Sequence, residues 1–161
     1  MTQALKYETA SSGETQALAA RLGEIVQSGD VLCLSGDLGA GKTTFTQGLA
    51  RGLGIEEPVS SPTFTIIKEY DDGRIPLYHM DIYRLGEAAV QEDLGYDEYF
   101  YGEGVSVIEW YGFLEELIPE DRLELHITLA EGDGRRLRFT ATGPHATARL
   151  KELEQLCPTS H

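Results

Sequence analysis

The sequence predicts an α/β fold in which a mixed central sheet is flanked by helices. Two short apolar runs, at 31–34 and 105–108, have the length and composition of buried strands. Apolar residues at helical spacing follow the first run as far as Gly54. Two later segments, 123–129 and 137–141, alternate apolar and polar residues on either side of a turn, which predicts an antiparallel pair. Strands that alternate with helices before such a pair favour a mixed sheet.

The N-terminal part of the chain predicts two strands and two helices. Residues 1–10 favour an edge strand. Ser11 and Glu14 have the spacing of a capping box, and the amphipathic helix that they begin is expected to end at Gly29. The next strand, its loop and the second helix are expected within 31–53.

The later elements are shorter. Segments 65–70 and 75–83 flank an Asp-Asp-Gly turn and predict a hairpin. Residues 87–103 interleave acids with tyrosines and predict short helices, which form either a solvated face or a docking surface for a partner. We expect a C-terminal helix and a loose tail within 144–161.

A glycine-rich stretch, GDLGAGKTT, joins the second predicted strand to the second helix. Two glycines five positions apart, followed by Lys42 and Thr43, match the pattern of a phosphate-binding loop. Glycines allow backbone amides to point inward around an anion, lysine can reach the β- and γ-phosphates, and a threonine hydroxyl can bind Mg²⁺. The expected nucleotide-binding residues are Asp37, Leu38, Gly39, Ala40, Gly41, Lys42, Thr43 and Thr44.

The composition limits the classes of protein to consider. At 161 residues the chain has room for one domain, so we expect residues 1–161 to form a single P-loop ATPase domain. A net charge of −14 would repel a nucleic-acid backbone, so we expect any nucleic acid to be handled through a partner. No apolar run has the roughly 20 residues of a membrane span, and the two cysteines form no disulfide framework. These features predict a cytoplasmic protein without a membrane partner.

Two predicted strands end in a carboxylate, which hydrolysis of a magnesium-bound nucleotide requires. Glu109 follows the more apolar strand and is the stronger metal candidate, beside Thr43. Asp81 could either bind the metal or polarise water. Two carboxylates around one cation titrate together, so their separate roles stay open at this stage. With Lys42 they form the expected catalytic set.

Three further residues have both a structural and a functional interpretation. Thr63 lies in a loop bracketed by prolines and is either a surface turn or a sensor of the γ-phosphate. His79 lies on the same strand face as Asp81 and is either a core residue or part of the site. Trp110 follows Glu109 and is either a core anchor or a residue of the site or of an interface.

The sequence gives weaker indications of which nucleotide base is bound and of how fast the nucleotide is hydrolysed. The chain has no Asn-Lys-x-Asp sequence of the kind that selects guanine, so ATP with Mg²⁺ is the expected ligand pair. Arg74 and Arg84 are the arginines nearest to the proposed site in the sequence, and neither lies in an obvious finger loop. We therefore expect slow hydrolysis by the isolated chain.

The sequence resembles the bacterial TsaE (YjeE-like) family, the ATPase needed to make threonylcarbamoyladenosine in tRNA. The resemblance covers essentially the whole chain. It is carried by GDLGAGKTTF at 36–45, SPTF at 61–64, the run His79, Asp81, Tyr83 and Arg84, and the pair Glu109 and Trp110. The phosphate loop is shared by many families, whereas the other three motifs make the resemblance specific.

The resemblance implies roles for several residues. Lys42 and Thr43 would bind phosphate and Mg²⁺, Glu109 would contribute to the metal site, Asp81 would support hydrolysis and Trp110 would matter to activity. It also implies that the chain works with TsaD and TsaB, which transfer the threonylcarbamoyl group to the adenosine beside the anticodon. ATP turnover would reset or remodel that complex, and tRNA would be involved only indirectly.

Two other functions share parts of the pattern. A small-molecule kinase of the same loop class would want an arginine-bearing lid and an acceptor pocket, and the short chain shows no sign of either. An adaptor that senses ATP without hydrolysing it would need the loop but not the two carboxylates, although both could serve binding alone.

Overall fold

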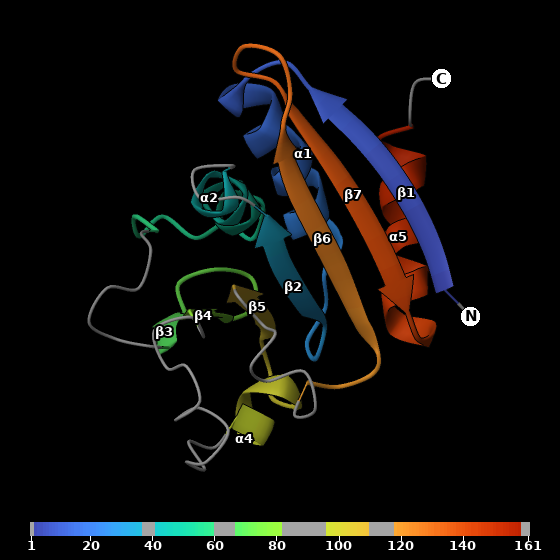
Figure 1. Cartoon of the computed structure of the whole chain (residues 1–161). Helices are drawn as coiled ribbons and strands as arrows, with labels where there is room; N and C mark the ends of the chain where they lie inside the picture. The colour runs from blue at the N-terminus through green and yellow to red at the C-terminus, as the bar shows by residue number, and fades with distance from the viewer. Residues whose placement is uncertain (1, 37–40, 60–66, 82–95, 110–117, 159–161) are drawn as a thin grey trace.

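Seven strands form one mixed sheet, and four helices accompany it in the parts of the chain that the computed structural model describes (Figure 1). Those parts are residues 2–36, 41–59, 67–81, 96–109 and 118–158. The strands are β1 (Thr2–Thr9), β2 (Val31–Gly36), β3 (Ile67–Tyr70), β4 (Leu77–Asp81), β5 (Val105–Glu109), β6 (Arg122–Leu129) and β7 (Arg135–Thr142). The helices are α1 (Ser12–Ile25), α2 (Lys42–Gly52), α4 (Tyr96–Phe100) and α5 (Pro144–Leu156).

The strand order is β1-β7-β6-β2-β5-β4-β3. β2 pairs in parallel with β6 on one side and β5 on the other, and β4 continues the parallel run beyond β5. β7, β1 and β3 are joined by antiparallel pairing, which confirms the predicted mixed sheet. The carboxyl ends of β2, β4, β5 and β6 therefore lie at one edge of the sheet, and their amino ends lie at the opposite edge. In open α/β sheets ligands bind at the carboxyl edge.

The sheet separates two hydrophobic clusters. The larger one lies between the sheet and α1, α2 and α5, which lie on the same face. The smaller one lies on the other face and includes Phe100 of α4. Alternate residues of β2 enter different clusters: Leu32 and Leu34 face the larger one, and Val31 and Cys33 face the smaller one. Burial on both faces explains why this strand is apolar throughout instead of alternating. None of the described helices is long and apolar enough to cross a membrane.

Helices α1 and α2 pack through small residues. A Cβ atom on Gly23 would stand 2.2 Å from the carbonyl oxygen of Leu49, and one on Gly52 would stand 2.1 Å from that of Ala20. A side chain at either position would therefore collide with backbone. Because this close contact fixes α2 on α1, it also fixes the N-terminus of α2, where the glycine-rich loop ends.

The predicted C-terminus of α1 is wrong by four residues. The helix ends at Ile25, because Val26 leaves it with an extended conformation (φ −61°, ψ 150°). Arg74 takes the place of a glycine cap: its Nη2 donates to the carbonyl oxygens of Gly23 at 2.9 Å and Val26 at 2.7 Å. Gly29, the expected end, has φ +89° and lies in the turn that enters β2. At the other end of α1, Ser11 accepts from the Glu14 amide at 3.2 Å, as the capping box predicts.

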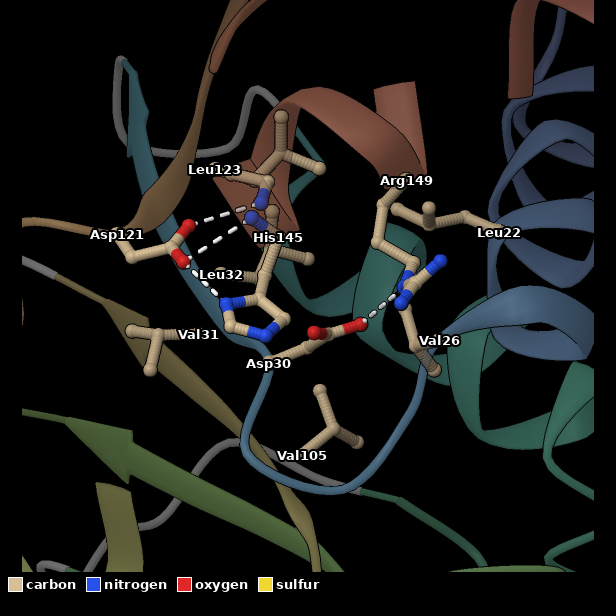
Figure 2. A pocket seen from close by; sticks show the side chains of 11 residues that line it. Leu22, Val26, Asp30, Val31, Leu32, Val105, Asp121, Leu123, His145 and Arg149 are labelled. Carbon is tan, nitrogen blue, oxygen red and sulfur yellow. Dashed lines mark hydrogen bonds and ion pairs between the residues drawn. The ribbon is translucent and has the colours of Figure 1, made fainter. Parts of the chain in front are cut away.

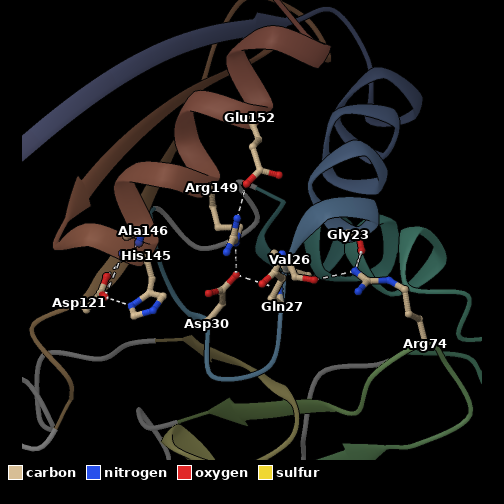
Figure 3. A network of polar contacts seen from close by, with 10 residues as sticks. All are labelled: Gly23, Val26, Gln27, Asp30, Arg74, Asp121, His145, Ala146, Arg149 and Glu152. Atoms are coloured by element: carbon tan, nitrogen blue, oxygen red, sulfur yellow. Dashed lines mark hydrogen bonds and ion pairs between the residues drawn. The ribbon is translucent and has the colours of Figure 1, made fainter.

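Helix α5 is attached to the amino edge of the sheet by charged side chains (Figure 3). The Asp121 carboxylate, just before β6, accepts from the amides of His145 at 3.0 Å and Ala146 at 2.9 Å in the first turn of α5. One turn further on, Nε of Arg149 donates to Asp30, just before β2, at 2.8 Å. These contacts confirm the expected C-terminal helix and explain its position. Residues 159–161 of the expected tail lie outside the described residues.

Candidate nucleotide site

The glycines at the two ends of the phosphate-binding loop have left-handed conformations. Gly36 ends β2 with φ +145°, and a Cβ atom there would stand 2.2 Å from the carbonyl oxygen of Ile127 on β6. Gly41 has φ +106° and directly precedes α2, whose N-terminus has no side-chain cap. Glycine adopts both conformations without strain, and at Gly36 it also avoids a collision with the backbone of β6. The uncapped N-terminus of α2 presents amide donors and the positive end of its dipole, which favour an anion.

Lys42 begins α2, and its side chain reaches back to the end of β2. Its side chain is buried, with 7% of its surface exposed, and Nζ donates to the carbonyl oxygen of Gly36 at 3.0 Å. The ammonium group is therefore held at Gly36, where β2 ends. Thr43 and Thr44 follow in the first turn of α2 and are partly buried. Phe45 is fully buried and secures this turn in the larger hydrophobic cluster.

A buried acid and a histidine meet at the same edge of the sheet. Nε2 of His79 on β4 and Oε2 of Glu109 on β5 lie 2.5 Å apart. His79 is fully buried and Glu109 is 4% exposed. In the register of the sheet, Glu109 pairs with both Leu34 and Asp81, so the carboxyl ends of β2, β5 and β4 coincide. Leu34 lies two residues before Gly36, which brings the end of β5 alongside the start of the loop.

The histidine determines how the acid is held. A carboxylate this deeply buried needs a charged or hydrogen-bonding partner, and His79 provides one from the adjacent strand. Nδ1 of His79 is buried and has no hydrogen-bond partner within the described part of the chain. The imidazole therefore orients Glu109 through Nε2, the arrangement in which second-layer groups hold metal-binding carboxylates.

The oxygen donors at this edge suit Mg²⁺, which prefers hydroxyl, carboxylate and phosphate oxygens. Across the described ranges, no group of three or more His, Cys, Asp or Glu side chains could hold a metal ion without other ligands. In nucleotide sites Mg²⁺ takes one or two carboxylates and a hydroxyl beside the phosphates, and Glu109 and Thr43 carry groups of these two kinds.

Several residues predicted from the sequence cannot be placed. Those outside the described residues are Asp37, Leu38, Gly39, Ala40, Thr63 and Trp110. For Asp81 the structure gives the backbone position alone, at the end of β4 beside Glu109. The structure thus brings Gly41, Lys42, Thr43 and Thr44 together in one turn and brings His79 to Glu109.

Sequence reasoning missed one residue that the fold brings to the loop. Nε of Arg135, in the first residue of β7, lies 3.7 Å from the position that a Cβ atom on Gly41 would occupy. The arginines nearest in sequence do not predict this. Arg74 instead caps α1, and Arg84 lies outside the described residues. The position of Arg135 in the fold could have indicated it. The residue directly follows the hairpin after β6, and β6 pairs with β2.

A cavity at the amino edge is not a second ligand site (Figure 2). Its volume is about 20 Å³, which is room for about one water molecule. The polar side chains on its wall are engaged with one another: Asp121 with His145 and Asp30 with Arg149. The cavity is a gap under α5 rather than a place for a nucleotide.

The mixed sheet with its four parallel strands, the glycine-bounded loop after β2 and the buried lysine at the start of α2 define an α/β protein with the P-loop NTPase fold. Residues 9–137 match the family model described as "Threonylcarbamoyl adenosine biosynthesis protein TsaE". The chain belongs to the TsaE family, whose members take part in threonylcarbamoyladenosine biosynthesis.

Relatives and a solved structure agree with this assignment. The TsaE protein of Bacillus subtilis is 52% identical over 151 residues, which cover 94% of each chain. The TsaE protein of Treponema pallidum is 43% identical over 124 residues, which cover 76% of this chain and 91% of that protein. The crystal structure of Bacillus subtilis YdiB superposes with a TM-score of 0.82 at 46% identity and covers 97% of each chain.

Proposed function

We propose that the chain binds ATP with Mg²⁺ at the carboxyl edge of the sheet and hydrolyses it in support of threonylcarbamoyladenosine modification of tRNA. The observation that carries the proposal is the burial of two unlike groups at this edge of the sheet. The ammonium of Lys42 is buried against the carbonyl of Gly36 at the end of β2, and the carboxylate of Glu109 is buried at the end of the neighbouring strand. A cation for phosphates and an acid for a metal are the parts that nucleotide hydrolysis needs.

The roles of the individual residues follow from their positions. Lys42 and the amides at the start of α2 would hold the phosphates, and the Thr43 hydroxyl would bind Mg²⁺. Glu109, oriented by His79, would bind the metal directly or through water. Asp81, at the end of the next strand, would polarise the attacking water. When bound, Mg²⁺ would neutralise charge on the phosphates and so compensate for a chain with net charge −14.

The partners proposed are TsaD and TsaB, and tRNA would be involved only through them. The family assignment supports this pathway, and the acidic surface of the chain supports an indirect role for tRNA. In this scheme the transfer of the threonylcarbamoyl group occurs on the partner proteins. ATP turnover in the present chain resets or remodels their complex.

The test is to follow γ-labelled ATP by thin-layer chromatography with the purified chain, with and without TsaB, TsaD and tRNA. The expected result is release of inorganic phosphate, slow for the chain alone and faster with the complex. Label transferred to an acceptor other than water would identify a kinase instead. ATP binding without phosphate release under either condition would identify a nucleotide-sensing adaptor.

A further inference from the structure

The hairpin between β6 and β7 lies beside the phosphate-binding loop, although it is far from it in the sequence. β6 runs parallel to β2, and its Ile127 pairs with Gly36, so β6 extends beyond the end of β2. The hairpin is closed by hydrogen bonds from the Ala130 amide to the Gly134 carbonyl and from the Gly134 amide to the Glu131 carbonyl, each at 3.0 Å. This closed turn fixes the position at which β7 begins.

Arg135 is the first residue of β7 after this turn, and its side chain lies beside Gly41. A Cβ atom on Gly41 would stand 3.7 Å from Nε of Arg135 and 3.8 Å from Cβ of Thr44. The guanidinium group therefore lies at the N-terminus of α2, where the Gly41 backbone and the first turn of the helix face an anion. A hydrogen bond from its Nη1 to the Gly134 carbonyl, at 2.8 Å, ties the side chain to the hairpin.

The chemistry of this position is that of a phosphate contact. A guanidinium group is permanently charged and presents several donors in one plane, which matches phosphate oxygens. In a chain with 13 basic and 27 acidic residues, a second cation beside Lys42 would offset an unfavourable overall field. We propose that Arg135 binds the phosphates of the nucleotide from the side of the β6–β7 hairpin. This inference rests on the proposed nucleotide function of the loop.

The next residue provides a matched control. Arg136 carries the same charge on the same strand, but alternation places its side chain on the other face of the sheet. Its side chain is 65% exposed and lies 3.4 Å from the Glu8 carboxylate of β1. Removal of Arg136 therefore changes the net charge as removal of Arg135 does, without changing the neighbourhood of Gly41.

The experiment measures ADP affinity in the presence of Mg²⁺ by calorimetry for the full chain and for Arg135→Ala, Arg135→Gln and Arg136→Ala. A lost charge-assisted contact is expected to weaken ADP by about tenfold to hundredfold in both Arg135 variants. Arg136→Ala is expected to stay within about twofold of the unaltered chain because exposed charges contribute little. Thermal unfolding of each variant checks the fold, and Arg135→Gln retains most of the side-chain length should Arg135→Ala fold poorly.

Competition by inorganic pyrophosphate identifies the part of the nucleotide that is contacted. Pyrophosphate should lose affinity for the Arg135 variants in parallel with ADP. A loss confined to ADP would place Arg135 at the base or sugar and overturn the proposal, as would equal ADP affinities for the Arg135 and Arg136 variants. If the unaltered chain binds neither ADP nor pyrophosphate, the proposed nucleotide function itself fails, and this inference fails with it.

Discussion

Charged side chains have different contacts at the amino edge and at the carboxyl edge of the parallel strands. At the amino edge, Arg149 meets Asp30 and Asp121 meets the start of α5, so opposite charges from distant segments join to hold a helix (Figure 3). At the carboxyl edge, the ammonium of Lys42 is held at a backbone carbonyl inside a loop whose terminal glycines have left-handed conformations. At the amino edge these charged contacts stabilise the fold, whereas at the carboxyl edge we propose that Lys42 serves a ligand. Variants at each edge can test whether the two edges have these different roles.

The largest effect is expected at Lys42. Lys42→Ala removes the cation from the loop, and ATP turnover should fall by roughly a thousandfold, as for loss of a preorganised electrostatic contact. The midpoint of thermal unfolding should stay close to that of the unaltered chain, because α2 packs into the core through Phe45 and Leu49. Arg51→Ala, on the exposed last turn of the same helix, is the control. Unchanged turnover in Lys42→Ala would place the site elsewhere.

The opposite result is expected at the amino edge. Arg149→Leu leaves the Asp30 carboxylate without its ion pair in a position where the two side chains are only 9% and 10% exposed. The free energy of unfolding should fall by about 3 kcal/mol, as when one partner of a buried pair is removed. ADP affinity should not change under conditions where the variant is folded. Lys151→Ala, exposed on the same helix, should leave both quantities unaltered.

A loss of ADP affinity in Arg149→Leu, measured where the variant is fully folded, would contradict the idea that the two edges have separate roles. The two edges would then be coupled through the sheet, and the amino edge would influence the nucleotide site. Chemical denaturation measured in the presence and absence of ADP distinguishes this from simple destabilisation, because a bound ligand adds a stabilisation that depends on its own affinity.

The hydrogen bond between His79 and Glu109 is a buried polar contact at the carboxyl edge, so it tests the difference between the two edges directly. If it serves a metal rather than the fold, Glu109→Gln and His79→Gln should each raise the Mg²⁺ concentration required for turnover by about tenfold to hundredfold. The double variant should be no worse than the single ones, since both remove the same oriented carboxylate. Tyr78→Phe, the neighbouring residue of β4, serves as the control.

Additive losses in the double variant would mean that His79 and Glu109 act independently. Equal magnesium titrations for all variants, with loss of thermal stability alone, would assign the pair to the fold. In that case the His79–Glu109 pair would stabilise the fold, as the charged contacts at the amino edge do, and the two edges would not differ at this position.

The sequence predicts the parts of the site that are local, and it misses those that depend on strand order. Lys42 and Thr43 are placed by the spacing of the loop, and Glu109 by the end of an apolar strand. The partnership of His79 with Glu109 requires β4 to lie beside β5, and the approach of Arg135 to Gly41 requires β6 to lie beside β2. Apolar periodicity identifies strands but does not specify their neighbours.

The same distinction explains the errors in element ends. The helix expected to reach Gly29 stops at Ile25 because Arg74, from another part of the chain, satisfies the carbonyl oxygens of its last turn. A glycine in the sequence is a local stop signal, whereas a capping arginine becomes visible only when the fold is known. The strands and the first cap of α1, which depend on neighbouring residues, agree with the prediction.

The smallest expected effect concerns Asp121 and depends on pH. Burial alone would raise its pKa, but hydrogen bonds from the Ala146 amide and from the His145 ring and amide lower it below the ordinary value. A lowered pKa means that the ionised carboxylate stabilises the fold above about pH 4, and that this contribution is lost as the pH falls through the lowered pKa. Asp121→Ala should therefore cost about 1 kcal/mol near neutral pH, the usual value of a helix cap, and the difference should vanish in acid.

Asp30 gives the contrast that makes this measurement decisive. Burial raises the pKa of Asp30 above its ordinary value, despite the opposing contacts with Gln27 and Arg149. Because a raised pKa means that protonation favours the folded state, the contribution of Asp30 has the opposite sign and grows as the pH falls. Denaturant titrations at several pH values should show the cost of Asp121→Ala shrinking in acid while Asp30→Asn shows no such decline. A cost for Asp121→Ala that is constant with pH would mean that its carboxylate acts by packing rather than by charge.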